Sequence, residues 1–378
     1  MKKILIINAY YYPGWRSGGP QQTIMNVVEV FGSQSQIHIL THNHDMGESE
    51  LYPNICYDVW TDIGKAKVYY SSKEKFTMTF LRELANQFDL VYLCGPYCEY
   101  SYKVLLLNRM KHIKTKIVLA SMGSFSKGAL SHKQFKKRVF WTVFKTFGFY
   151  KDIMWSFTSE MEKNEAIARI GKVCSCNYYI AEDLPRHYID LSDKRVTYKK
   201  PGNLRIVFLS RICPQKNLIQ AIDVVSKLNG DIQFDIYGTQ EDAAYWKQCE
   251  KALSLLGSTV KWSYCGAVPS ENVIDTFLNY DVFLFPSMGE NFGHVIYEAL
   301  MAGCIPLVSN RTPWNNLEEN ECGYSIPLEN VGSYVDRVQQ YVNMDDTTLS
   351  KQRINAMKYA EKKYQESVQL SGYSKILN

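Results

Sequence analysis

Two cationic side chains follow a predicted β-strand at a point where a phosphate could bind. Arg211 and Lys216 lie in residues 210–217, directly after the apolar run 205–210 and before a helix expected from Leu218. Open α/β folds bind ligands at the carboxyl ends of their strands. A planar guanidinium beside an ammonium suits a diphosphate. Taken alone, the pattern is equally compatible with two solvated surface cations.

Two carboxylates flank the start of a second predicted helix. Glu290 follows the apolar strand expected at 282–286, and Glu298 stands two helical turns along a helix predicted to begin near Phe292. A carboxylate among apolar neighbours needs a partner, and a ribose diol offers two hydroxyl donors. The alternative is that Glu290 only supports the helix N-terminus electrostatically and Glu298 faces solvent.

A glycine pair ends the loop that follows the first predicted strand, residues 3–9. Gly18 and Gly19 precede Pro20, which opens a helix. Backbone amides at a helix N-terminus favour an anion. The segment is not GxGxxG, so it carries no dinucleotide fingerprint, and a strand-to-helix turn also uses glycine for geometry alone.

These segments need a scaffold, and an alternation of β-rich apolar runs with amphipathic stretches predicts parallel sheets wrapped by helices. The other predicted strands are 37–41, 90–94, 116–120, 153–158, 233–237, 260–264 and 305–309. The polar stretch 183–203 separates two halves. We therefore expect domains at 1–195 and 203–359, with a C-terminal helix, about 360–378, packing back on the first.

The composition is that of an ordinary globular protein of 378 residues with a net charge of +5. The apolar start is too short for a signal peptide, and no stretch approaches the ~20 apolar residues of a spanning helix, so we expect a cytoplasmic protein. Ten cysteines without an export signal favour reduced thiols. The pairs Cys94/Cys98 and Cys174/Cys176 lack a matching pair of zinc-site spacing, and we expect no metal.

Positive charge is concentrated in one band. Residues 100–151 contain twelve Lys or Arg and no Asp or Glu. Within 127–151, apolar residues follow one helical face and Lys133, Lys137, Trp141 and Lys145 another, which predicts an amphipathic helix on an anionic membrane with Trp141 at headgroup depth. The alternative is a helix whose apolar face is core. Nucleic acid is not expected, because no binding module is recognisable.

The E-x7-E spacing of Glu290 and Glu298, inside ENFGxxxxEAL, resembles the retaining nucleotide-sugar glycosyltransferases of family 4. The resemblance implies the GT-B fold, an α/β architecture of two Rossmann-like domains facing each other across a donor-binding cleft. Further similar motifs follow in the family's order: SRxxPQKN at 210–217, Tyr237-Gly238, YCGAV at 264–268, MAGCIPLVSN at 301–310, TPWNNLE at 312–318, and, near the N-terminus, Gly18-Gly19 and FTSE at 157–160.

The resemblance implies roles for the charged candidates. Arg211 and Lys216 would bind the donor diphosphate and, with Glu290 at the donor sugar and β-phosphate, form the catalytic set, while Glu298 would bind the ribose. It also implies donor contacts made through backbone or small side chains at Gly18, Gly19, Gly238, Val268, Asn291, Phe292 and Gly293. Many relatives place a His near the acceptor side, whereas the corresponding residues 121–125 here contain none.

The implied activity is retaining transfer of a sugar from a nucleoside diphosphate sugar, with UDP preferred, to a glycan or polyprenyl-linked acceptor in cell-surface polysaccharide biosynthesis, such as capsule, O-antigen or lipopolysaccharide. No Asp-x-Asp stands at a strand end, so we expect metal independence and no cofactor. Two alternatives stay open: a sugar-nucleotide epimerase of the same fold, and a non-catalytic subunit that binds nucleotide sugar or glycan.

Overall fold

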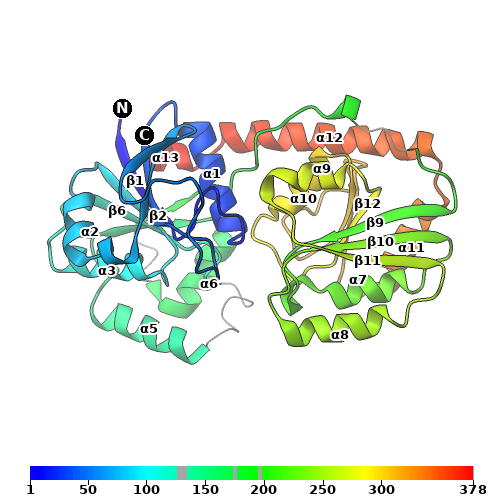
Figure 1. The fold of residues 1–378 in the computed structure, drawn as a ribbon, viewed down its shortest axis with the longest axis horizontal. Helices are drawn as coiled ribbons and strands as arrows, with labels where there is room; N and C mark the ends of the chain where they lie inside the picture. Colours follow the sequence, from blue (N-terminus) through cyan, green and yellow to red (C-terminus); the bar gives the residue numbers. More distant parts are fainter. Residues whose placement is uncertain (126–133, 173–176, 195–197, 378) are drawn as a thin grey trace. The chain divides into compact units, whose positions relative to one another are not determined.

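The computed structural model describes residues 1–125, 134–172, 177–194 and 198–377. The chain divides into two compact units (Figure 1). The first unit contains Met1–Pro185 and Glu366–Asn378, and the second contains Arg186–Gln365. The division therefore falls at Pro185, ahead of the expected end of the first domain at residue 195. Each unit is an α/β structure built on its own sheet.

The first unit holds an eight-stranded sheet in the order β3-β4-β2-β1-β5-β6-β7-β8. Its strands are β1 (Lys3–Ile7), β2 (Gln36–His42), β3 (Trp60–Ile63), β4 (Ala66–Ser71), β5 (Leu90–Cys94), β6 (Lys116–Ala120), β7 (Ile153–Phe157) and β8 (Tyr178–Ile180). All neighbours are parallel except β3 and β4. All five strands predicted in this half are confirmed, and β3, β4 and β8 are additional.

Helices cover both faces of this sheet, because the strands alternate apolar side chains to either side. The helices are α1 (Gly19–Phe31), α2 (Met78–Ala85), α3 (Glu99–Arg109), α5 (Gln134–Thr146), α6 (Glu160–Ile170) and α13 (Tyr373–Leu377). Ile4 and Ile6 pack in one core with α1 and α13, and Leu5 and Ile7 pack in the other with α2, α3 and α5. The last residues of the chain thus complete the core of the first unit.

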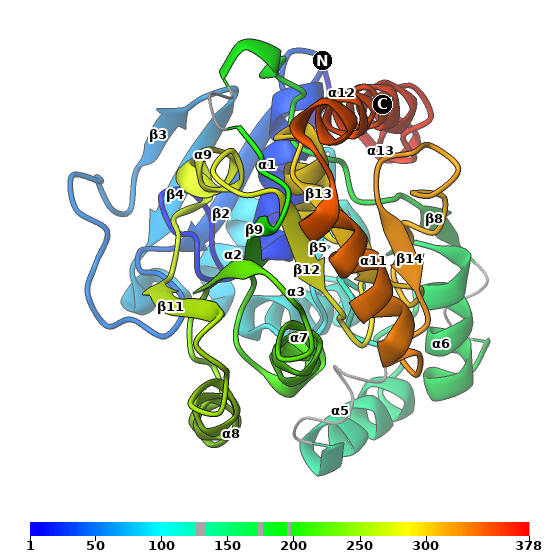
Figure 2. The same cartoon turned by 90° about the vertical axis from the view of Figure 1, so that its right-hand side faces the viewer.

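The second unit holds a fully parallel sheet in the order β11-β10-β9-β12-β13-β14. In Figure 2 the labelled strands β11, β9, β12, β13 and β14 of this sheet follow one another from left to right. Its strands are β9 (Asn203–Leu209), β10 (Asp231–Tyr237), β11 (Val260–Gly266), β12 (Val282–Phe285), β13 (Ile305–Ser309) and β14 (Tyr324–Ile326). All five strands predicted in this half are confirmed. Counted along the chain, this is the 3-2-1-4-5-6 order of doubly wound folds, whose direction reverses between β9 and β12.

The helices of the second unit are α7 (Leu218–Val225), α8 (Ala243–Leu253), α9 (Val273–Phe277), α10 (His294–Met301), α11 (Val331–Asn343) and, up to Gln365, α12 (Asp346–Gln369). α7 packs with α8 and α11, and α9 packs with α10. A buried ionic cluster ties α12 to the sheet: Asp281, which directly precedes β12, pairs with Arg353 of α12 and, at 2.7 Å, with Arg205 of β9.

α5 corrects one prediction. Trp141, expected at headgroup depth, is buried against Phe125 and Trp155, and its indole N–H donates to the Tyr97 hydroxyl at 2.9 Å. Phe144 is buried with it. Trp141 and Phe144 lie on the side of α5 that packs against the core, where Phe140 is also partly buried. Phe135, Val139 and Val143 lie on another side of the helix and stay exposed, as does Phe147 just after it. Lys127 and Lys133 of the expected membrane segment lie outside the described residues.

Across the described ranges, no helix is both long and apolar enough to span a bilayer. The same ranges contain no group of three or more His, Cys, Asp or Glu arranged to hold a metal ion. Cys94 and Cys98 are free thiols, and Cys174 and Cys176 fall outside the part of the chain that the structure describes.

Candidate functional site

The charged candidates of the second unit gather at the point where its strand order reverses. β9 ends at Leu209 and β12 at Phe285, and the two strands are paired neighbours. The loop after β9 carries Arg211 and Lys216, and the loop after β12 carries Glu290. Doubly wound folds bind ligands outside the carboxyl ends of such strands, because the connections leave to opposite faces and open a crevice there.

Hydrogen bonds lock these two loops together. The backbone amide of Met288 donates to Gln215 O at 2.9 Å, and the Gln215 side chain donates to Gly289 O at 3.2 Å. Asn217 has φ of 59°, and its amide group donates to Pro286 O at 3.0 Å. The positions of the side chains on the two loops are therefore fixed relative to each other.

Lys216 and Glu290 form a shielded ion pair. The Lys216 ammonium lies 2.7 and 2.9 Å from the two oxygens of Glu290, and the side chains are 13% and 11% exposed. The Ser287 hydroxyl also donates to Glu290 at 2.6 Å. Lys216 is thus not a solvated surface cation, and Glu290 bonds to a side chain rather than only supporting the next helix.

Arg211 is in a different environment. Its side chain is 43% exposed, and its guanidinium donates to Glu241 at 2.7 Å. Such a pair at the surface is weak, because solvent screens both charges. Arg211 is therefore a cation that a more strongly charged ligand could recruit.

The backbone of a neighbouring loop leaves no room for a side chain at Gly238. A Cβ built there would lie 1.7 Å from Ser210 O, in the residue before Arg211. The Tyr264 hydroxyl donates to Gly238 O at 2.8 Å. Val268, another of the expected donor contacts, packs partly buried against the core of the second unit. The close approach of backbone at Gly238 sets the course of the loop that carries Arg211.

The segment before α10 is shaped by glycine and by a tryptophan. The helix begins at His294, two residues later than expected, with Gly293 as its N-cap at φ of 80°. The Phe292 side chain is buried against Trp314, while Asn291 is exposed. Only the backbone of Phe292 can therefore contact a ligand, and the first turn of α10 is closed by the Ile296 amide, which donates to Gly293 O at 2.8 Å.

Glu298 lies inward on α10 and not toward solvent. It is 6% exposed, and its carboxylate is 3.1 Å from the guanidinium of Arg186. Burial raises the pKa of Glu298 to about 7, and Arg186 acts in the opposite direction. Sequence reasoning missed Arg186, because a single cation in a polar connecting stretch carries no motif.

The candidates in the first unit belong to the loop after β1. Gly18 is the N-cap of α1 at φ of 70°, and Gly19 is the first residue of that helix. The Asp45 carboxylate accepts hydrogen bonds from the backbone amides of Trp15 at 2.9 Å and Arg16 at 3.3 Å. Asp45 therefore holds the loop that brings the glycines to the helix N-terminus.

The loop after β6, where many relatives carry a His, is held by a buried carboxylate instead. Met122 and Gly123 have φ of 48° and 74°. Glu162 accepts from the Gly123 amide at 2.7 Å and from the Thr158 amide at 2.8 Å. Glu162 thus anchors the carboxyl ends of β6 and β7, a role that the sequence did not reveal.

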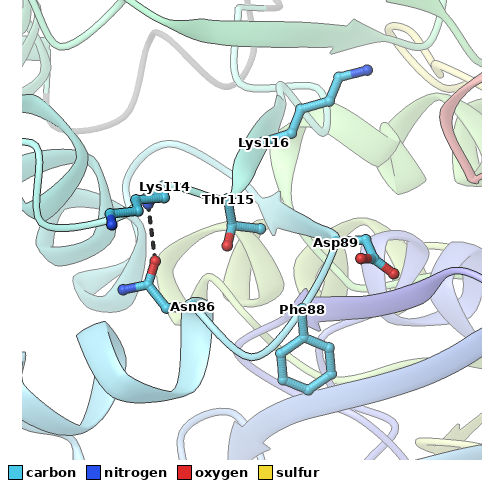
Figure 3. A pocket seen from close by; sticks show the side chains of 6 residues that line it. All are labelled: Asn86, Phe88, Asp89, Lys114, Thr115 and Lys116. Atoms are coloured by element: carbon cyan, nitrogen blue, oxygen red, sulfur yellow. Dashed lines mark hydrogen bonds between the residues drawn. The ribbon is translucent and has the colours of Figure 1, made fainter.

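Two pockets lie away from these groups. One is lined by Asn86, Phe88, Asp89, Lys114, Thr115 and Lys116, and Figure 3 shows the Asn86 side chain reaching the Lys114 amide. These residues precede β5 or open β6, so the pocket is at the amino edge of its sheet. The other adjoins the first residues of β9, β10 and β11 and lies at the amino edge of the second sheet.

Comparison with known proteins identifies the second unit. Residues 191–363 match the family model described as glycosyl transferases group 1. The matched residues make up most of the second unit. All the charged candidates after β9 and β12, from Arg211 to Glu298, lie inside the matched region, whereas Arg186 precedes it.

Solved structures resemble the whole chain. HepE of Anabaena, in complex with UDP and glucose, has a TM-score of 0.67 at 14% identity and covers 98% of both chains. WaaG, a glycosyltransferase involved in lipopolysaccharide biosynthesis, has a TM-score of 0.63 at 12% identity and covers 99% of both. These neighbours are GT-B glycosyltransferases, and the fold of this chain is GT-B.

A curated relative matches part of this chain. The GtfA subunit of a UDP-N-acetylglucosamine–peptide N-acetylglucosaminyltransferase from Streptococcus agalactiae is 28% identical over 126 residues. The match covers 32% of this chain and 24% of that relative, so the chain is matched to about a quarter of the relative's length.

Proposed function

We propose that the protein transfers a sugar from a nucleoside diphosphate sugar, with UDP preferred, to a glycan or polyprenyl-linked acceptor, with retention at the anomeric carbon. The observation that carries the proposal is the shielded Lys216–Glu290 pair after β9 and β12, in the region that matches the group 1 glycosyl transferases. The preference for UDP is supported by the UDP complexes of the structural neighbour HepE.

In this proposal the cations act on the leaving group. As the bond from the anomeric carbon to the phosphate oxygen loosens, negative charge grows on the diphosphate. Fixed cations stabilise that charge more than the ground state and so lower the barrier. Lys216 and Arg211 supply them without a metal ion, assisted by the backbone amides that open α10.

The proposed transfer balances without a further reactant. The acceptor hydroxyl attacks the anomeric carbon from the face that the diphosphate leaves, so the configuration is retained. A new bond forms from the acceptor oxygen to carbon, the bond from carbon to phosphate oxygen breaks, and the hydroxyl proton passes to the departing phosphate oxygen. No histidine of the first unit is needed for this proton.

The biological setting proposed is the synthesis of a cell-surface polysaccharide such as capsule, O-antigen or lipopolysaccharide. It is supported by the likeness to WaaG, a lipopolysaccharide glycosyltransferase, and by the surface of α5. Phe135, Val139 and Val143 follow each other every four residues and are exposed. We define them as the α5 stripe.

The α5 stripe suits an anionic lipid surface. Lys136, Arg138 and Lys145 on the same helix are exposed, and α5 contains no acidic residue. α5 lies at the periphery of the first unit in both Figure 1 and Figure 2. Apolar insertion together with attraction to anionic headgroups is how interfacial helices bind, and it would bring the enzyme to a polyprenyl-linked acceptor.

The proposal is tested first by nucleotide binding. A thermal-shift panel of nucleoside diphosphates and their sugars, run with EDTA, should show stabilisation by UDP and its sugars, since a ligand at 100 times its Kd adds about 2.7 kcal/mol. Radiolabel transfer from the stabilising donor to lipid and glycan extracts then follows, and the anomeric configuration of the product gives the stereochemistry. Binding without transfer to any extract would favour a non-catalytic subunit.

A further inference from the structure

Arg186 makes a set of contacts that centres on Glu298. One terminal nitrogen of its guanidinium lies 3.1 Å from the Glu298 carboxylate, and the two side chains are 19% and 8% exposed. The same nitrogen donates to Ser270 O at 2.8 Å and to the Ser270 hydroxyl at 2.7 Å. Ser270 opens the short 3-10 helix Ser270–Asn272, directly before α9. The cation is therefore held in place on two sides.

Burial would otherwise neutralise this carboxyl group. It raises the pKa of Glu298 to about 7, and Arg186 is the charge that opposes the rise. Burial also lowers the pKa of His294 to about 3, with Arg186 adding to the effect, so His294 is neutral near pH 7. Among the described residues, three tyrosines whose protons stay on at neutral pH also couple to this cluster: Tyr188 of the connecting segment, Tyr297 of α10 and Tyr364 of α12.

The ion pair with Arg186 leaves the Glu298 carboxylate able to accept further hydrogen bonds. An ionised carboxylate has two oxygens with about four lone-pair positions. Within the described residues, Glu298 forms its ion pair with Arg186. The guanidinium contacts one of the two carboxylate oxygens, Oε1. An ionised Glu298 can therefore accept hydrogen bonds from a ligand, whereas a protonated one would offer a donor in place of an acceptor.

We propose that Arg186 is a positioning residue for the ribose of the nucleotide: it keeps Glu298 ionised and oriented so that the carboxylate accepts hydrogen bonds from the ribose hydroxyls. This inference rests on the proposed function, in which Glu298 binds the ribose. Arg186 acts through Glu298 and through its anchor Ser270, and it makes ribose recognition depend on a residue outside the region matched by the family model.

A purely structural role for Arg186 would have different consequences. If the residue only attached the connecting segment to α10, its loss would weaken all nucleotides equally at every pH. A positioning role changes the preference for ribose over deoxyribose, because a protonated carboxyl group accepts poorly from a 2′-hydroxyl. The preference for the 2′-hydroxyl is therefore the quantity to measure.

The experiment measures Kd for UDP and for 2′-deoxyuridine diphosphate by calorimetry between pH 6 and pH 9. Wild type should prefer UDP by ~10-fold at pH 8, the size expected for a hydrogen bond to a charged group, and lose the preference as pH falls through about 7. In Arg186→Gln the preference should drop to within ~2-fold at pH 7.5 and return only at higher pH, because the pKa of Glu298 rises further without the cation.

Two further variants separate charge from folding. Arg186→Lys keeps a cation and should retain most of the wild-type pH profile. Ser270→Ala keeps both charges but removes one anchor, and it should shift the profile in the same direction as Arg186→Gln by a smaller amount. Arg337→Gln, at a partly exposed arginine of α11 that pairs with Glu318, is the matched control and should behave as wild type.

The outcomes distinguish this inference from the proposed function. If wild type binds neither UDP nor GDP, the proposed function fails. If wild type binds GDP, the same series is run with GDP and 2′-deoxyguanosine diphosphate. If Arg186→Gln or Ser270→Ala shows the wild-type ribose preference over the whole pH range, the positioning role is overturned while the proposed function stands.

Discussion

The ammonium of Lys216 lies within hydrogen-bond distance of both oxygens of Glu290, at 2.7 and 2.9 Å. The cation proposed to bind a phosphate is thus balanced by a carboxylate when no ligand is present. A pair this shielded cannot simply lose one member, because the other would remain as an uncompensated charge. A diphosphate must therefore compete with Glu290 for the Lys216 ammonium.

Removal of the Lys216 charge should impair turnover. Lys216→Ala is expected to lower the transfer rate by ~10²-fold or more, since it removes a charge partner of the leaving diphosphate. Initial rates with saturating donor measure the effect. The control is Lys227→Ala, at an exposed lysine of the same unit that pairs with Asp223, and it should retain wild-type rates. Equal rates in both variants would remove Lys216 from the diphosphate site.

Removal of the Glu241 charge should tighten donor binding. Glu241 holds Arg211 at 2.7 Å in an exposed pair, and such pairs contribute roughly 0.2–1 kcal/mol. Glu241→Gln frees the guanidinium and should lower the Kd for UDP by ~2-fold to ~5-fold, whereas Arg211→Ala should raise it. Titration calorimetry measures both.

The matched control for that experiment is Glu250→Gln, at an exposed glutamate of α8. It changes net charge by the same amount at another place in the second unit. A Kd for UDP that falls equally in Glu241→Gln and Glu250→Gln would attribute the gain to overall charge, and an unchanged Kd in Glu241→Gln would show that Arg211 does not meet the diphosphate.

Asp183 should make the first unit less stable as pH rises. The Thr23 hydroxyl donates to its carboxyl at 3.0 Å, and burial raises its pKa to about 7, with Glu162 and Glu182 adding to the rise. The folded state therefore holds a proton that the unfolded state releases near pH 4, so this contribution to stability is complete below about pH 4 and is lost as pH rises through about 7.

Asp183→Asn tests that dependence. The amide cannot ionise and still accepts from Thr23, so the variant should match wild type at pH 4.5 and unfold at a higher temperature at pH 8. Calorimetric scans at the two pH values measure the midpoints. Asp193→Asn, at an exposed aspartate, should leave both midpoints unchanged. A variant less stable than wild type at pH 8 would mean that the ionised form is the favoured one.

Binding to anionic vesicles should depend on both parts of α5. Lys136→Glu with Arg138→Glu should weaken partitioning by ~30-fold or more, because each cation near the surface contributes about 1 kcal/mol. Val139→Ser with Val143→Ser should weaken it through lost apolar insertion. Sedimentation with phosphatidylglycerol vesicles at low and high salt measures both, with Lys227→Glu as the control. Equal binding of wild type to neutral vesicles would contradict the electrostatic contribution.

The central strands could be predicted because burial on both faces makes them continuous apolar runs. β5, β6 and β13 have the predicted bounds. Three of the four strands that were missed lie at sheet edges: β3 is exposed on alternate residues, and β8 and β14 have three residues each. The fourth, β4, is an interior strand between β3 and β2. Such edge strands depend on their neighbours for hydrogen bonds, and their own sequence carries little periodicity.

The site residues that belong to sequence motifs could be predicted. Those whose role depends on a contact with a residue distant in the sequence could not. Lys216 and Glu290 stand 74 positions apart, and only the strand order brings them together. Arg186, Glu241 and Glu162 have partners that no spacing along the chain reveals. Trp141 was misplaced because helical periodicity separates an apolar from a polar face but does not say how much of the apolar face the core covers.

The C-terminal residues 366–378 belong to the first unit, and this determines which fragments of the protein can be produced separately. Residues 186–365 run without interruption through the second unit, so a fragment with these ends keeps its whole sheet. A fragment of residues 1–185 would lack Tyr373, Ile376 and Leu377, and it would expose the apolar surface of α1 and the sheet that they cover. Gene fusions that need the first unit alone should therefore graft residues 366–378 back onto it through a linker.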